Sequence, residues 1–177
     1  MAKILVIDDA KDFCQVLGHF LSRHGFEVLE ANQGATALEL LRKEKPDLIL
    51  CDYRLNDMDG STVLRSLKEI NIDVPVVIVT GHGSIKTAVD VMKIGAVDYL
   101  IKPFTAKELV SRVNSQIRLK AIRKEAEGFL RDLFDQAPVP ICVLKGSELI
   151  IHQANPLMLE FWGKRFEEVL HKRIGEV

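Results

Sequence analysis

The 177-residue chain has few cysteines, no excess of either charge and no long apolar run. Its three cysteines, Cys14, Cys51 and Cys142, form an odd set without metal-ligand spacing, which argues against a disulfide framework or a cysteine metal site. Lysine and arginine total 24 against 25 acidic residues, so the basic character of nucleic-acid-binding proteins is missing. Membrane-spanning runs and the apolar core of a signal peptide are also missing. These absences favour a cytoplasmic protein with no membrane partner and no nucleic-acid partner.

The chain does contain a regular alternation of short apolar runs and amphipathic segments. Five apolar runs, each too brief for a helix, predict strands at 4–7, 26–30, 47–52, 75–80 and 96–101. Each run is followed by apolar residues at helical spacing. The stripe after the fourth run, which we expect mostly to face the core, consists of Ile85, Ala88, Val89 and Met92. Five alternations predict an α/β fold, a doubly wound five-stranded parallel sheet with helices on both faces.

Polar residues stand where four of these strands end. Asp8 and Asp9 follow the first strand, and Asp52 ends the third. Thr80 ends the fourth strand, and Lys102 follows the fifth. Right-handed crossovers bring the carboxyl ends of parallel strands to one edge of the sheet, where ligands bind. A single aspartate there is better explained as a turn cap, but five polar residues at corresponding positions favour a functional site.

These residue types suit phosphoryl chemistry. Three carboxylates at one edge repel one another unless a cation lies between them. Mg²⁺ prefers oxygen ligands and leaves coordination positions for water and phosphate. Lys102 adds a positive charge and Thr80 a hydroxyl donor. The set therefore predicts a nucleophilic carboxylate, a metal and a cation around a phosphoryl group.

Residues 3 to about 120 resemble the receiver domain of two-component response regulators, a flavodoxin-like fold. The motifs that carry the resemblance are Asp8-Asp9, Asp52, Thr80-Gly81 and Lys102-Pro103-Phe104. Receivers of the nitrogen-regulator type are the most similar, through Tyr53-Arg54-Leu55, Met58-Asp59-Gly60 and the run Thr80 to Ser84. One departure is Asn56-Asp57, where such receivers often carry Pro-Gly, and it concerns the stiffness of the loop rather than the chemistry.

The resemblance implies a phosphorylation site and a metal site. Asp52 would be the phosphoacceptor, and a histidine kinase or phosphotransfer protein would donate the phosphoryl group from a phosphohistidine. Asp9 and Asp52 would bind Mg²⁺ together with the backbone carbonyl of Arg54, whereas Asp8 would act through water. The receiver would contribute to its own phosphorylation and dephosphorylation without being an enzyme.

The resemblance also implies a conformational switch. Thr80 and Lys102 would contact the phosphoryl oxygens, and the movement of Thr80 would leave space that Tyr99 fills. The Lys102–Pro103 peptide is expected to be cis, which would direct the lysine into the site. His82 either tunes the release of phosphate or is simply an exposed loop histidine.

A long helix is predicted from about 105 to 136. Its first turns should pack on the sheet through Leu109, Val113 and Ile117. The following apolar residues have the three-four spacing of a coiled-coil seam, namely Leu119, Ile122, Ala126, Phe129 and Leu133. We expect a homodimer through this helix or through the fourth-helix face, and a single amphipathic helix is the alternative.

Residues 137–177 resemble the beginning of a PAS sensor domain. Two short strands form a predicted hairpin around Lys145-Gly146-Ser147, and Asn155-Pro156 opens a helix. The segment is shorter than a complete PAS sheet requires, so we expect an incomplete PAS domain and a fragment or truncated product of a longer signalling protein.

The sequence therefore predicts a receiver at 1–120, a connecting helix at 105–136 and an incomplete PAS domain at 137–177. Phosphorylation would alter the receiver, and the helix would transmit the change to the PAS domain and an output region. An aspartate-nucleophile phosphohydrolase of the haloacid-dehalogenase type is one alternative. That family carries an Asp-x-Asp pattern after its first strand, whereas Asp8 and Asp9 are adjacent here. A phosphorylation-independent dimerisation module is the other alternative.

Overall fold

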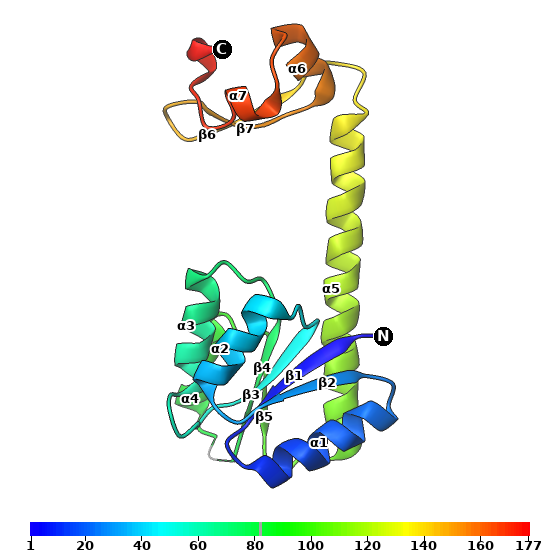
Figure 1. Cartoon of the computed structure of the whole chain (residues 1–177), viewed down its shortest axis with the longest axis vertical. Helices are drawn as coiled ribbons and strands as arrows, with labels where there is room; N and C mark the ends of the chain where they lie inside the picture. The colour runs from blue at the N-terminus through cyan, green and yellow to red at the C-terminus, as the bar shows by residue number, and fades with distance from the viewer. Residues whose placement is uncertain (82) are drawn as a thin grey trace. The chain divides into compact units, whose positions relative to one another are not determined.

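The computed structural model of the chain describes residues 1–81 and 83–177 (Figure 1). It divides the chain into two compact units, Met1–Ala121 and Ile122–Val177. Helix α5 (Ala106–Asp135) contributes residues to both.

The first unit is built on a parallel sheet of five short strands. These strands are β1 (Lys3–Ile7), β2 (Glu27–Ala31), β3 (Leu48–Asp52), β4 (Val76–Thr80) and β5 (Asp98–Ile101). Their order is β2-β1-β3-β4-β5, and every neighbouring pair is parallel. The predicted doubly wound sheet is therefore confirmed. The first strand begins one residue earlier than predicted, the second, third and fourth begin one residue later, and the fifth begins two residues later.

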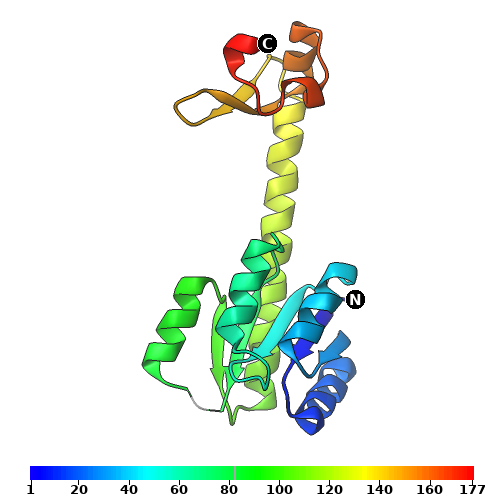
Figure 2. The same cartoon turned by 60° about the vertical axis from the view of Figure 1, so that its left-hand side comes forward.

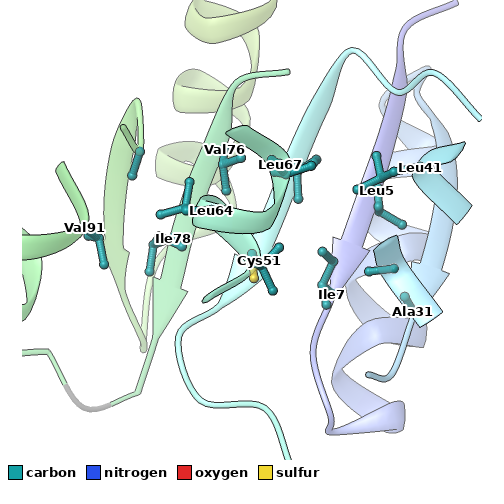
Figure 3. Close-up of a cluster of buried hydrophobic side chains, with 14 residues drawn as sticks. Leu5, Ile7, Ala31, Leu41, Cys51, Leu64, Leu67, Val76, Ile78 and Val91 are labelled. Atoms are coloured by element: carbon teal, nitrogen blue, oxygen red, sulfur yellow. The ribbon is translucent and has the colours of Figure 1, made fainter. Parts of the chain in front are cut away.

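Helices cover both faces of this sheet (Figure 2). They are α1 (Lys11–Arg23), α2 (Gly34–Lys43), α3 (Gly60–Glu69), α4 (Ile85–Ile94) and the first turns of α5. One apolar cluster joins the sheet to α2, α3 and α4, and Figure 3 shows its buried side chains. A second cluster joins the opposite face to α1 and α5. All residues of β3 and β4 are buried, because these central strands are covered on both faces.

The predicted orientation of α4 is wrong. Ile85, Val89 and Met92 are exposed, Ile85 by 87%, and Ala88 is half-buried. Val91 is the buried residue of this helix. The helix carries apolar residues on more than one side, so helical periodicity alone did not decide which side faces the core. The exposed side chains form a stripe on the outer surface of α4.

Helix α5 differs between its two ends. Leu109 and Val113 are buried in the second apolar cluster and Ile117 packs against it, as predicted. The predicted seam residues from Leu119 to Leu133 are exposed. In the part of the chain that the structure describes, no helix is both long enough and apolar enough to cross a membrane.

The second unit contains a hairpin and short helices, as the sequence predicted. Strands β6 (Cys142–Lys145) and β7 (Ile150–Ala154) pair antiparallel. They are followed by α6 (Pro156–Trp162), α7 (Phe166–Val169) and the 3₁₀ helix η1 (Ile174–Glu176). The carboxamide of Asn155 caps α6 by accepting the N–H of Met158 at 2.9 Å.

Candidate phosphorylation site

The carboxyl edge of the parallel sheet gathers residues from four strands. The registers place the end of β1 beside the end of β3, and Thr80 on β4 beside Ile101 on β5. Asp8, Asp52 and Thr80 are buried there, with exposed fractions of 3%, 8% and 1%. Lys102, the residue after β5, is half-buried at the same edge. Residues separated by up to 94 positions are therefore in contact.

Lys102 connects the two buried carboxylates. Its Nζ lies 2.5 Å from Asp8 Oδ2 and 2.9 Å from Asp52 Oδ1. The same ammonium lies 4.0 Å from the centre of the Phe13 ring on α1. Phe13 contacts Phe104 edge-on, with the ring centres 6.3 Å apart. The spacing of apolar residues in the sequence gives no sign of this contact, since a cation–π contact leaves no signal in periodicity.

Burial and pairing act in opposite directions on these ionisable groups. Burial raises the pKa of Asp52, and although Lys102 and the N–H of Arg54 oppose this, the pKa stays above its usual value. Burial lowers the pKa of Lys102, but hydrogen bonds to Asp8 and Asp52 outweigh it and leave the pKa raised. Asp52 Oδ2 also accepts the Arg54 N–H at 2.6 Å. The structure thus holds Lys102 charged beside a carboxylate that burial makes less acidic.

The metal ligands implied by the family resemblance belong to the end of β3 and to the segments that follow β1 and β3. Asp9 is half-buried next to Asp8, and Asp8 Oδ1 accepts the N–H of Ala10 at 3.0 Å. Within residues 1–81 and 83–177, no three or more His, Cys, Asp or Glu side chains are gathered to hold a metal. The available donors are all carboxylate and carbonyl oxygens, the types that Mg²⁺ prefers. By its chemistry the donor set therefore fits Mg²⁺.

The two residues of the predicted switch lie on neighbouring strands. The backbone N–H of Lys102 donates to the Thr80 carbonyl at 2.7 Å. The Tyr99 hydroxyl on β5 is buried without a hydrogen-bond partner among the residues described, and burial raises the pKa of its phenol. A Cβ added to Gly83 would lie 3.0 Å from that hydroxyl. The Lys102–Pro103 peptide is cis. His82 lies outside the described residues.

The loop after β3 contains a contact that sequence reasoning missed. The carboxylate of Asp57 accepts the backbone N–H groups of Gly34 and Ala35, at 3.0 and 2.9 Å. Burial raises the pKa of Asp57, but these donors outweigh it and leave the pKa below its usual value. The sequence showed Asn56-Asp57 only as a departure from Pro-Gly. Nothing in the local pattern indicated a contact with a helix more than twenty residues away.

This fold and site define a class of protein. It is an α/β domain whose central strand ends in a buried aspartate that is paired with a lysine beyond the fifth strand. The family model of the response regulator receiver domain matches residues 4–114, and a PAS domain model matches residues 128–177. The chain belongs to the response regulator receiver family and carries a PAS domain after the receiver.

Curated relatives match mainly the receiver. The transcriptional regulatory protein ZraR of Escherichia coli K12 is 46% identical over 100 residues, which cover 56% of this chain and 23% of ZraR. The regulatory protein AtoC of the same strain is 36% identical over 123 residues, covering 70% of this chain and 27% of AtoC. The chain thus spans about a quarter of the length of these relatives.

Solved structures show the same fold. The crystal structure of NtrX from Brucella abortus superposes with a TM-score of 0.71 at 29% identity, covering 84% of this chain and 33% of that chain. The receiver domain of a LuxO repressor protein from Vibrio parahaemolyticus superposes with a TM-score of 0.68 at 27% identity, covering 71% and 97%. The matched regulators are of the nitrogen-regulator type, the subgroup that the motifs indicated.

Proposed function

We propose that this chain accepts a phosphoryl group on Asp52 from a phosphohistidine of a partner histidine kinase or phosphotransfer protein. One observation carries the proposal: the buried Asp52 carboxylate lies 2.9 Å from Lys102 at the carboxyl edge of the sheet. A carboxylate at the edge of the sheet can act as the nucleophile that attacks phosphorus, and the neighbouring ammonium can neutralise the negative charge of the phosphoryl group. Family membership supports this function over a haloacid-dehalogenase type of phosphohydrolase.

The surrounding residues have distinct roles in this proposal. One oxygen of Asp52 attacks phosphorus, and the phosphohistidine nitrogen leaves with the electron pair of the broken bond. Lys102 and Thr80 contact the phosphoryl oxygens and neutralise their charge. Asp9, Asp52 and the Arg54 carbonyl would hold Mg²⁺, and Asp8 would act through water. The bound Mg²⁺ supplies further neutralisation of charge on the phosphoryl group.

The phosphorylated site is proposed to act through Thr80 and Tyr99. Thr80 is drawn toward the phosphoryl group, and Tyr99 moves into the space that Thr80 leaves. The position of Tyr99 supports this, because Tyr99 lies on β5, the strand that pairs with β4 and its terminal Thr80. The change then passes from a receiver at 1–120 through the helix at 105–136 to a PAS domain at 137–177 and an output region. The receiver acts on its own phosphorylation state and not as an enzyme on other molecules.

The test is incubation of the full chain with acetyl phosphate and Mg²⁺, followed by measurement of its mass. We expect the mass of one phosphoryl group on the wild type and on Asp47→Ala, a control at the opposite end of β3. Asp52→Ala should remain unlabelled. Labelling of Asp52→Ala, or an unlabelled wild type, would contradict the proposal.

We also propose that two copies of the chain associate through α5. The seam residues Leu119, Ile122, Phe129 and Leu133 are exposed at the three-four spacing of a coiled coil. Ile85, Val89 and Met92 on α4 form a second exposed apolar stripe, which is the alternative surface. We expect the seam to bind the α5 helix of a second copy of the chain, because that helix has apolar residues at the same three-four spacing.

Sedimentation of the full chain tests the dimer. Phe129→Asp places a charge in the seam and should convert the dimer to monomer, whereas Ala121→Asp, outside the seam, should not. The fraction of dimer measured by sedimentation should also change when beryllofluoride, a phosphoryl mimic, is added. A monomeric wild type in both states contradicts association through α5. Loss of the dimer only in Val89→Asp would assign it to α4.

A further inference from the structure

We infer that Asp57 is a positioning residue for the loop that carries the Arg54 carbonyl, an inference that rests on the proposed function. This loop, residues 53–59, joins β3 to α3 and is named here the metal loop. Asp57 itself is exposed and makes no contact with Asp52 in the hydrogen bonds described. Its effect on the metal site is therefore exerted through the backbone of the loop.

Asp57 provides the N-terminal cap that α2 lacks in its own sequence. The local N-cap residue, Gln33, makes no side-chain cap hydrogen bond, and the first turn of α2 contains no acidic residue. The two carboxylate oxygens of Asp57 accept the N–H groups of Gly34 and Ala35 instead. A carboxylate at this position also meets the positive end of the helix dipole. The metal loop is therefore attached to α2.

Met58 adds a packing contact at the same place. A Cβ added to Gly34 would lie 2.4 Å from the Met58 sulfur, so the close approach of loop and helix depends on glycine. Within the loop, the N–H of Leu55 donates to the Met58 carbonyl at 3.1 Å. Arg54 forms an antiparallel bridge with Asp59. A displacement at Asp57 and Met58 is thus transmitted to the Arg54 backbone.

The residues before α2 contact the other side of the metal site. The Asn32 side chain donates to the Asp8 carbonyl at 3.2 Å, and the Asp8 N–H donates to the Ala31 carbonyl at 3.1 Å. The start of α2 therefore lies between two segments that carry proposed metal ligands. One segment holds Asp8 and Asp9, and the other holds Arg54. Asp57 closes the connection between them.

Metal affinity depends on how well the ligands are held before binding. Groups that orient ligands without touching the metal have large effects on affinity, because free ligands must be ordered on binding. The structure thus assigns Asp57 a role in Mg²⁺ affinity and leaves the phosphoryl transfer itself to Asp52, Lys102 and Thr80.

The test measures Mg²⁺ binding to the unphosphorylated full chain by calorimetry. Asp57→Ala should raise the dissociation constant about 10-fold. Asp57→Asn retains one acceptor oxygen and should have an intermediate value. Asp47→Ala is the matched control, because Asp47 also accepts a backbone N–H, that of Lys3, but at the amino end of β3. This control should lose stability while keeping the wild-type dissociation constant.

Labelling by acetyl phosphate separates positioning from chemistry. At saturating Mg²⁺, Asp57→Ala should be labelled within about twofold of the wild-type rate, because only the requirement for metal has changed. At low Mg²⁺ its labelling should fall well below that of the wild type.

Each outcome decides the inference. An unchanged Mg²⁺ dissociation constant in Asp57→Ala would mean that Asp57 only caps α2, and absence of Mg²⁺ binding by the wild type also overturns the inference. If Asp57→Ala does not fold, the dissociation constant of Asp57→Asn decides. A wild type that binds Mg²⁺ without being labelled on Asp52 contradicts the proposed function alone, since the comparison of Mg²⁺ affinities still stands.

Discussion

The central strands of the receiver and the hairpin of the PAS domain differ in how far their residues are buried. Every residue of β3 and β4 is buried, because helices cover both faces of the sheet. In the hairpin, no residue of β6 is buried, and only Ile151 and Ala154 of β7 are. The receiver is therefore stabilised by apolar burial on two faces, whereas few of the apolar residues of the second unit are buried.

Hydrogen bonds to one buried side chain hold the second unit together. Asn155 is fully buried, and its Oδ1 accepts the N–H groups of Ile141 and Met158, both at 2.9 Å. Its Nδ2 donates to the carbonyls of Phe134 and Val139, at 3.3 and 2.8 Å. One carboxamide thus joins the end of α5, the approach to β6 and the start of α6. A polar hub here takes the place of an extensive apolar core.

The largest expected effect tests whether the two units unfold independently. Ile49 in β3 and Ile151 in β7 are both fully buried. Ile49→Ala should destabilise the receiver by about 3 kcal/mol, because it leaves a cavity in a closely packed core. Ile151→Ala should affect only the second unit. Urea unfolding followed by circular dichroism reports mainly on the receiver, and fluorescence of Trp162, the single tryptophan, reports on the second unit.

A change in the unfolding of both units would contradict the prediction that Ile151→Ala affects only the second unit. Equal shifts of both signals in Ile151→Ala would show that the units unfold as one.

The next largest effect concerns the polar hub. Asn155→Ala leaves buried N–H and carbonyl groups unpaired and should destabilise the second unit by about 2 kcal/mol. Hydrogen exchange should show lost protection at the amides of Ile141 and Met158. Gln153→Ala, at an exposed position on β7, is the control and should leave both amides protected. Retained protection in Asn155→Ala would assign the stability of the second unit to its apolar contacts.

The smallest effect compares an ionisable cap in the receiver with the neutral Asn155 cap. Asp59 caps α3 by accepting the N–H of Thr62 at 2.8 Å. Burial raises its pKa, but hydrogen bonds from Ser61 and Thr62 outweigh this and leave the pKa lowered. A carboxyl with a lowered folded pKa adds stability above its unfolded pKa of about 4, and this stability is lost as the pH falls through the folded value.

Asp59→Ala should therefore cost about 1 kcal/mol at neutral pH and less in acid. Urea unfolding of the receiver across this pH range measures the difference from the wild type. A penalty that stays constant from neutral pH into acid would show that the charge of the cap contributes nothing.

Most of the receiver fold was predictable from the sequence. Buried parallel strands are nearly continuous apolar runs, so β1, β3 and β4 stand out in the chain. The orientation of α4 was not predictable, because its apolar residues occupy more than one side. Val91 and Ile85 are both apolar, yet Val91 is buried and Ile85 is exposed. The strand alternation also indicated which polar residues would meet at one edge, and Asp8, Asp52 and Lys102 do.

The sequence was sufficient to predict the doubly wound parallel fold, the residues at the strand ends and a long helix after the receiver. These features depend on patterns of apolar and polar residues that can be recognised within one short segment of the chain at a time. Only the tertiary structure decided that Lys102 joins Asp8 to Asp52, that Phe13 lies against the same ammonium and that Asp57 caps α2. Such contacts join residues far apart in the chain, and their geometry exists only after the sheet and its helices have packed.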